Sequence, residues 1–146
     1  MCCGRVSQLA LGPAAASNDT DVAAVMRQWV DGFNAGDSPS AVATCATQAS
    51  LIDDFAPHQW QGTDACARWF SDFRAMARTE GIAHATIKLA QPSHSETSAK
   101  FAYVVPPVTL SFERKGKPVT DKGILTVTLS KGTAGWRITG WAWADQ

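Results

Sequence analysis

The sequence lacks an excess of charge of either sign, because 13 lysines and arginines balance 13 aspartates and glutamates among its 146 residues. A balanced surface creates no strong field toward a polyanion, so we expect neither nucleic acid nor an anionic membrane as a partner. The sequence also has no apolar run of about 18 residues, the length that a membrane-spanning helix needs. Both absences indicate a soluble protein without a membrane span.

Cysteine is scarce, with four residues at positions 2, 3, 45 and 66. None is spaced with a histidine as zinc ligands are, and the acidic pair Asp53-Asp54 with His58 matches no zinc or calcium loop. We therefore expect no bound metal. Adjacent cysteines make a poor disulfide, and we predict that Cys45 and Cys66 are reduced, small and buried side chains.

Residues 1–18 lack the features of a folded element. Arg5 is the only early positive charge, and the weakly apolar stretch of residues 6–11 is short and contains Gln8. Residues 14–17, Ala-Ala-Ala-Ser, resemble a signal-peptidase site. We predict a disordered leader over residues 1–18, a single domain over residues 19–146 and a cytoplasmic location, with export through a signal within residues 1–17 as the alternative.

The first half of the chain has helical periodicity. Apolar side chains recur every three or four residues, which predicts helices over residues 19–35, 39–47 and 64–78. Capping residues precede these segments, and Gly36 and Gly81 follow the first and the third. Between the second and third helices, residues 49–55 are typical of a short strand and residues 56–62 of a loop.

After Gly81 the periodicity changes to two, which is typical of strands. We predict four strands, over residues 82–89, 99–113, 119–130 and 136–144, with turns at residues 115–117 and 132–135. Pro106 and Pro107 lie inside the second strand, where proline cannot donate to a ladder, so we expect a bulge or a change of curvature there. Helices followed by hairpins indicate an α+β fold.

Three stretches of sequence carry a resemblance to a known superfamily. They are residues 29–37 (Trp-Val-Asp-Gly-Phe-Asn-Ala-Gly-Asp), residues 49–55 (Ala-Ser-Leu-Ile-Asp-Asp-Phe) with Gly62 after them, and residues 140–145 (Gly-Trp-Ala-Trp-Ala-Asp). Together with the order of elements, they resemble the nuclear-transport-factor-2-like superfamily, which includes ketosteroid isomerases and SnoaL-like polyketide cyclases. The resemblance implies three N-terminal helices packed on a strongly curved, mainly antiparallel sheet that forms a cone with an apolar pocket.

The resemblance places a candidate catalytic carboxylate at Asp53. In ketosteroid isomerases the strand before the third helix carries an aspartate that moves a proton, and Asp53 falls at that place. A carboxyl group at the mouth of an apolar cone has a raised pKa, as a general base near neutral pH requires. The tyrosine and second aspartic acid of those enzymes correspond here to Trp29 and Leu125, and leucine donates no hydrogen bond. Steroid isomerisation by that mechanism is therefore disfavoured.

Two histidines are candidate partners of Asp53. Other members of the superfamily pair an aspartate with a histidine, and here His58 lies in the loop after Asp53 while His84 lies on the strand after the third helix. In an Asp53–His84 or Asp53–His58 dyad, the carboxylate would orient the ring and the ring would move the proton. The alternative is that both histidines lie on an exposed surface.

The aromatic residues are candidates for a pocket lining. Trp141 and Trp143 point to one side of the last strand because they alternate with Ala142. Ordinary core packing is the alternative, especially for Trp69 and Phe73. The predicted ligand-binding residues are Trp29, Phe55, Trp60, Tyr103, Leu125, Trp141 and Trp143. The opposite face of the strand would expose Trp136 and Ile138, which predicts a homodimer that covers them.

Two functions follow from this reading. The first is a small-molecule enzyme that needs no cofactor: an isomerase, cyclase, dehydratase or hydrolase that acts on an apolar or aromatic compound, with Asp53 as its base. The second is a non-catalytic domain that binds a ligand or dimerises. The sequence does not identify the ligand, because pocket shape decides it and members of one fold differ widely in substrate.

Overall fold

The computed structural model describes residues 13–146, which form three helices and eight strands. The first half holds α1 (Pro13–Ala35), α2 (Ser38–Val42), β1 (Cys45–Ile52), β2 (Gln59–Thr63) and α3 (Ala65–Glu80). The second half holds β3 (Ile82–Leu89), β4 (His94–Thr97), β5 (Phe101–Val105), β6 (Pro107–Arg114), β7 (Lys117–Gly132) and β8 (Gly135–Asp145). This order confirms the predicted α+β class. Residues 1–12 of the predicted leader lie outside the described residues.

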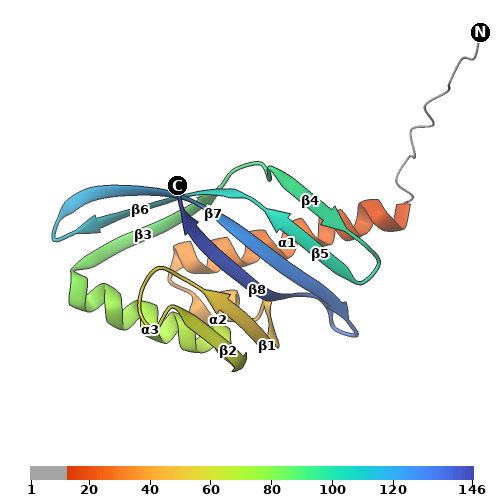
Figure 1. Ribbon diagram of the computed structural model, residues 1–146, viewed down its shortest axis with the longest axis horizontal. Helices are drawn as coiled ribbons and strands as arrows, with labels where there is room; N and C mark the ends of the chain where they lie inside the picture. Colours follow the sequence, from red (N-terminus) through yellow and green to blue (C-terminus); the bar gives the residue numbers. More distant parts are fainter. Residues whose placement is uncertain (1–12) are drawn as a thin grey trace, which may run out of the picture.

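All eight strands belong to one curved sheet, in which β7 pairs with three neighbours. β8 pairs along one side of β7, while β6 and β5 pair in succession along the other side. β1 runs parallel to β8, and the remaining pairings are antiparallel. Pro106 separates β5 from β6, so the predicted strand 99–113 is two strands. The helices cover one side of the sheet, with α3 beside β1 and β2 (Figure 1).

α1 presents its apolar face to the sheet. Val22, Met26, Trp29 and Phe33 recur at helical spacing, and all four are buried in the core. The helix begins six residues earlier than predicted, so residues 13–18 of the expected leader are helical. Buried Asn18 holds this end, because its Oδ1 accepts hydrogen bonds from Lys131 and Trp136 of the β7–β8 hairpin. None of the described helices is long and apolar enough to cross a membrane.

Two strands were not predicted from the sequence. Residues 56–62 were expected to be a loop, but residues 59–63 form β2, whose backbone pairs antiparallel with residues 48–52 of β1. β4 is short and polar, and pairing with β5 defines it. The second helix was predicted over residues 39–47, but α2 ends at Val42 and β1 begins at Cys45. Strand pairing is a long-range interaction, and in these segments it prevails over weak local preferences.

The predicted exposure of Trp136 and Ile138 is wrong. Both are buried, at 3% and 2% exposure. The register of β8 against β7 shifts by one residue, so that Ile138 pairs with Leu129 and Gly140 with Thr128, leaving Thr139 as the extra residue. Such a bulge reverses the alternation, and Trp136 therefore shares the inner face with Trp141. Because Trp136 and Ile138 are not exposed, they do not argue for a homodimer. The homodimer stays a prediction, which sedimentation would check.

The prediction that Cys45 and Cys66 are reduced is also wrong. The two residues form a disulfide with a Cα–Cα separation of 6.5 Å across 21 positions of sequence. It connects the start of β1 to the first turn of α3. Their separation in sequence carries no signal for pairing, and packing of α3 against β1 brings them together.

Opening this disulfide should lower the free energy of unfolding by roughly 2–4 kcal/mol, since the cross-link restricts the unfolded chain. Urea unfolding with and without a reductant measures the change. The double variant Cys45→Ser/Cys66→Ser is the control. Its urea midpoint should equal that of the reduced protein and should not change when the reductant is added. A midpoint that does not move on reduction would contradict a stabilising role for the cross-link.

Candidate functional site

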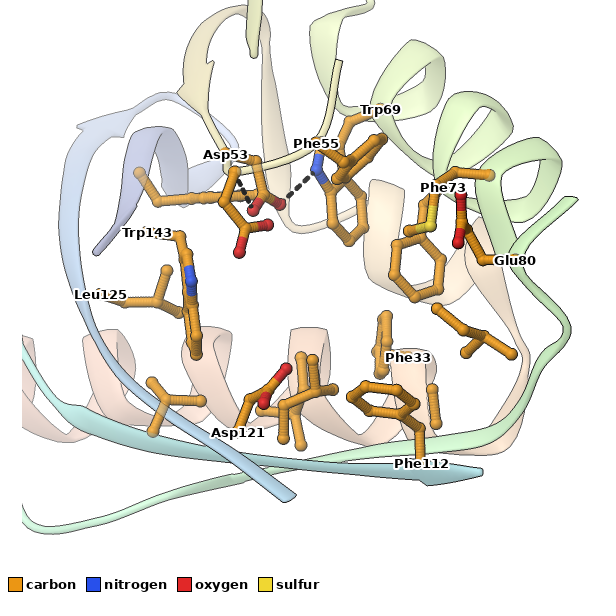
Figure 2. A pocket seen from close by; sticks show the side chains of 18 of the residues that line it. Phe33, Asp53, Phe55, Trp69, Phe73, Glu80, Phe112, Asp121, Leu125 and Trp143 are labelled. Atoms are coloured by element: carbon orange, nitrogen blue, oxygen red, sulfur yellow. Dashed lines mark hydrogen bonds between the residues drawn. The ribbon is translucent and has the colours of Figure 1, made fainter. Parts of the chain in front are cut away.

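The cone contains a cavity of about 300 Å³, bounded by α1, α3, the loop after β1 and the inner face of the sheet. Most of its wall is apolar, and eight of the twenty described residues that line it are aromatic, as Figure 2 shows for several of the rings. The rings come from α1 (Trp29, Phe33), α3 (Trp69, Phe73), β8 (Trp141, Trp143), β6 (Phe112) and the loop after β1 (Phe55). A cavity of this size accommodates a small ligand of one or two rings.

Asp53 lies at the inner end of the loop that follows β1, with its carboxyl group held by two donors. Trp69 Nε1 donates to Oδ2 at 2.9 Å, and the backbone N–H of Asp54 donates to Oδ1 at 2.7 Å (Figure 2). The loop is closed on itself, because the Asp53 N–H donates to the carbonyl of His58 at 3.0 Å. These contacts fix the carboxyl group at the wall of the cavity.

Burial among the rings raises the pKa of Asp53 from its ordinary value of 3.8 to about 7. The hydrogen bonds from the Asp54 N–H and from Trp69 oppose this shift, because they stabilise the carboxylate, and the negative charge of Asp54 adds to it. Asp53 therefore has both protonation states accessible near neutral pH. A carboxyl group with this property can accept a proton from a bound molecule and return it.

Stability should fall as the pH rises from about 4 to about 7, and it should level off above that range. Because the folded-state pKa of Asp53 lies above its unfolded value, the folded protein holds a proton that the unfolded chain has already released in this window. The loss is at most about 4 kcal/mol. Urea unfolding across this pH range measures it. The variant Asp53→Asn should lose this part of the pH dependence, and parallel curves for the two proteins would contradict the assignment.

Neither predicted histidine dyad forms. His58 is exposed, and its Nδ1 lies 3.0 Å from the backbone carbonyl of Asp53 rather than from the carboxyl group. His84 is exposed on β3 and does not line the cavity. It has a φ of 56° beside a register shift between β3 and β6, and its neighbour Ala85 faces the cavity instead. The alternative of two surface histidines describes the structure.

Five of the seven predicted ligand-binding residues line the cavity: Trp29, Phe55, Leu125, Trp141 and Trp143. Trp60 does not, because it is buried behind Phe55 and donates its indole N–H to Asp72 at 2.8 Å. Tyr103 lies on the other face of the sheet, 39% exposed and next to the ring of His94. Strand alternation explains Tyr103, because Ala102 and Val104 are the residues that β5 buries. Trp60 is the buried residue of β2, but the ring of Phe55 lies against it at 5.0 Å between centroids and lines the cavity in its place.

Sequence reasoning missed the charged residues of the cavity wall. Glu80 ends α3, Arg114 ends β6 and Asp121 lies on β7, and all three line the cavity together with Asp54. Asp121 shares the inner face of β7 with Leu125, so period-two alternation was a signal that could have found it. Glu80 and Arg114 lie at the ends of their elements, where periodicity is uninformative.

Trp141 has an unsatisfied donor. Its Nε1 is the one buried side-chain nitrogen or oxygen without a hydrogen-bond partner in the part of the chain that the structure describes. The ring of Trp141 stands edge-on to that of Trp69, with 5.1 Å between their centroids, and both rings line the cavity. Buried unpaired donors are uncommon, and this one is a candidate contact for an acceptor atom of a ligand.

No family model matches the chain, and no curated protein does. Solved structures match nearly all of it. A candidate dehydratase of the nuclear transport factor 2-like family from Streptomyces avermitilis is 12% identical with a TM-score of 0.75, over 90% of this chain and 98% of that one. A nuclear transport factor 2-like superfamily protein from Salmonella enterica is 13% identical with a TM-score of 0.74, over 89% and 92%.

A ketosteroid isomerase-like protein from Erwinia carotovora is 17% identical with a TM-score of 0.69, over 92% of this chain and 98% of that one. At such identities a likeness shows the fold alone. The chain has the cone-shaped, cystatin-like fold of nuclear transport factor 2-like proteins, as its sequence predicted.

Proposed function

We propose that this protein binds a small, largely apolar or aromatic molecule in the cone and moves a proton on it through the carboxyl group of Asp53. One observation carries the proposal: a carboxyl group with a pKa of about 7 is fixed by two hydrogen bonds in the wall of an aromatic cavity. A general base works best when its pKa lies near the pH of its surroundings.

The proposed step needs only groups of this chain. The carboxylate of Asp53 accepts a proton from the bound molecule, and the neutral acid returns it to another atom or to water. Trp69 keeps the carboxyl group oriented, because its N–H donates to Oδ2. The rings around Asp53, together with the bound molecule, reduce the water around the base while it acts. Isomerisation, dehydration and cyclisation all include a proton transfer of this kind.

The names of the matched structures support proton-transfer chemistry as a general class. One is called ketosteroid isomerase-like and another a candidate dehydratase, and both reactions transfer protons.

A non-catalytic ligand-binding domain is the second candidate function. It is favoured by Trp29 and Leu125, which occupy the positions that resemblance assigns to oxyanion donors and which are both buried apolar surface here.

Nitrobenzisoxazole tests the proton transfer, because removal of its C–H proton by a base breaks the ring N–O bond and releases a coloured phenolate. The protein should accelerate this reaction, with a rate that rises with pH through about 7 as Asp53 ionises. Asp53→Asn should lower the rate by at least about a hundredfold, the usual contribution of a general base.

The matched control is Asp54→Asn, which keeps the base and removes only a neighbouring charge. It should stay active with its pH midpoint displaced downward, because the charge of Asp54 raises the pKa of Asp53. If the probe quenches tryptophan fluorescence on binding but the wild-type protein releases no phenolate, the catalytic proposal fails and ligand binding without chemistry takes its place.

The Cys45–Cys66 disulfide supports the exported alternative over the cytoplasmic location. Disulfides form and persist in oxidising compartments, whereas cytosolic thiols are kept reduced. We expect the native protein in the exported fraction of its source cells, with Cys45 and Cys66 protected from alkylation until a reductant is added. Recovery in the cytosol with both thiols free would contradict export.

A further inference from the structure

The charged groups of the cavity wall are unequal in sign. Among the described residues, the lining includes the carboxyl groups of Asp53, Asp54, Glu80 and Asp121 against the single guanidinium of Arg114. In Figure 2, Asp53 and Asp121 lie on opposite sides of the cavity and Glu80 lies on a third side. Even with Asp53 protonated, the remaining carboxylates outnumber the cation.

Within residues 13–146, no lysine, arginine or histidine forms an ion pair with a carboxylate of the wall. The ion pair that the described residues contain joins His94 to Glu96 on β4, and neither residue lines the cavity. The guanidinium of Arg114 lies over the ring of Phe112, 5.6 Å from its centroid, rather than against a carboxylate. Among the described residues, the single guanidinium of Arg114 compensates only part of the negative charge around the cavity, and the remainder would repel an anionic ligand.

The aromatic rings of the wall also favour a cationic ligand over an anionic one. The faces of tryptophan and phenylalanine rings carry negative electrostatic potential and attract cations, most strongly where water is excluded. Trp69 and Phe73 stack 5.2 Å apart in this wall, and Trp29 stacks on Phe33 at 5.7 Å. Rings held against one another in this way present fixed surfaces to a ligand.

We propose that the cavity is selective for a small organic cation, an ammonium group carried on an apolar or aromatic frame. The inference rests on the proposed function, since it names the substrate class of the same cavity. The frame fills the aromatic interior, and the ammonium group is attracted by Asp54, Glu80 and Asp121. No anionic compound of the same shape has these interactions.

Such a ligand would also act on the base. A bound cation favours the carboxylate of Asp53 over the acid and so lowers its pKa from about 7. The coupling is reciprocal, so affinity for the cation should rise with pH across the titration of Asp53. The charged groups around Asp53 are Asp54 on its own loop, Asp121 on β7, Glu80 on α3 and Arg114 on β6, with His58 on its backbone carbonyl.

Three probes of matched size test the selectivity: phenethylammonium, phenethyl alcohol and phenylacetate, with binding measured by calorimetry and tryptophan fluorescence. The ammonium compound should bind about tenfold more tightly than the alcohol, and phenylacetate should bind most weakly. The difference should shrink at high salt, because the attraction is partly electrostatic.

Four variants assign the effect to the named charges. Glu80→Gln and Asp121→Asn should each weaken ammonium binding about threefold and leave the alcohol unchanged. Arg114→Gln should strengthen ammonium binding, since the substitution removes the positive charge of the guanidinium. Glu113→Gln is the matched control, because Glu113 adjoins Arg114 on β6 but does not line the cavity.

The outcomes separate this inference from the proposed function. Equal affinities for the ammonium compound and the alcohol, or an ammonium affinity that the cavity variants do not change, would overturn the cation preference while leaving a pocket for apolar molecules. Failure of all three probes to bind would count against the proposed function itself. The predicted ranking, with opposite effects of Asp121→Asn and Arg114→Gln, would support the inference.

Discussion

The hydrogen bond from Trp69 to Asp53 is the interaction on which the candidate site depends. It joins α3 to the loop after β1, and it gives a carboxylate a donor in a place where water is scarce. An ionised carboxyl group buried without partners is strongly disfavoured, so the side chain would turn to solvent or stay protonated. The Cys45–Cys66 disulfide lies one turn before Trp69 and ties α3 to the start of β1, the strand that leads into the loop of Asp53.

The density of aromatic rings has two opposing consequences. Ring packing excludes water and raises the pKa of Asp53, which is what makes it useful near neutral pH. The same rings could fill the cone, and backbone detail keeps it open. Gly123 is an example: a Cβ at this position would collide with the ring of Trp143, so the absence of a side chain allows that indole to pack against β7.

Charge and reactivity occupy different environments in this cavity. The carboxyl group of Asp53 is hydrogen-bonded and partly buried, whereas Asp54, Glu80 and Asp121 are exposed. Exposed carboxylates attract a ligand over a distance but contribute little individually to its binding. The fold provides the cone, and the residues placed on its wall decide the chemistry.

The sequence by itself determined the first and third helices and the turns, and the resemblance it carries indicated the place of Asp53. Helical periodicity identified α1 and α3, and the turns at residues 115–117 and 132–135 followed from glycine in local, short-range patterns. Only the tertiary structure decided what those elements bring together. A single extra residue at Thr139 reverses the face of Trp136 and Ile138, and packing of α3 on β1 pairs Cys45 with Cys66. The register of paired strands, and which residues from different elements meet, are set by tertiary contacts that no local sequence pattern encodes.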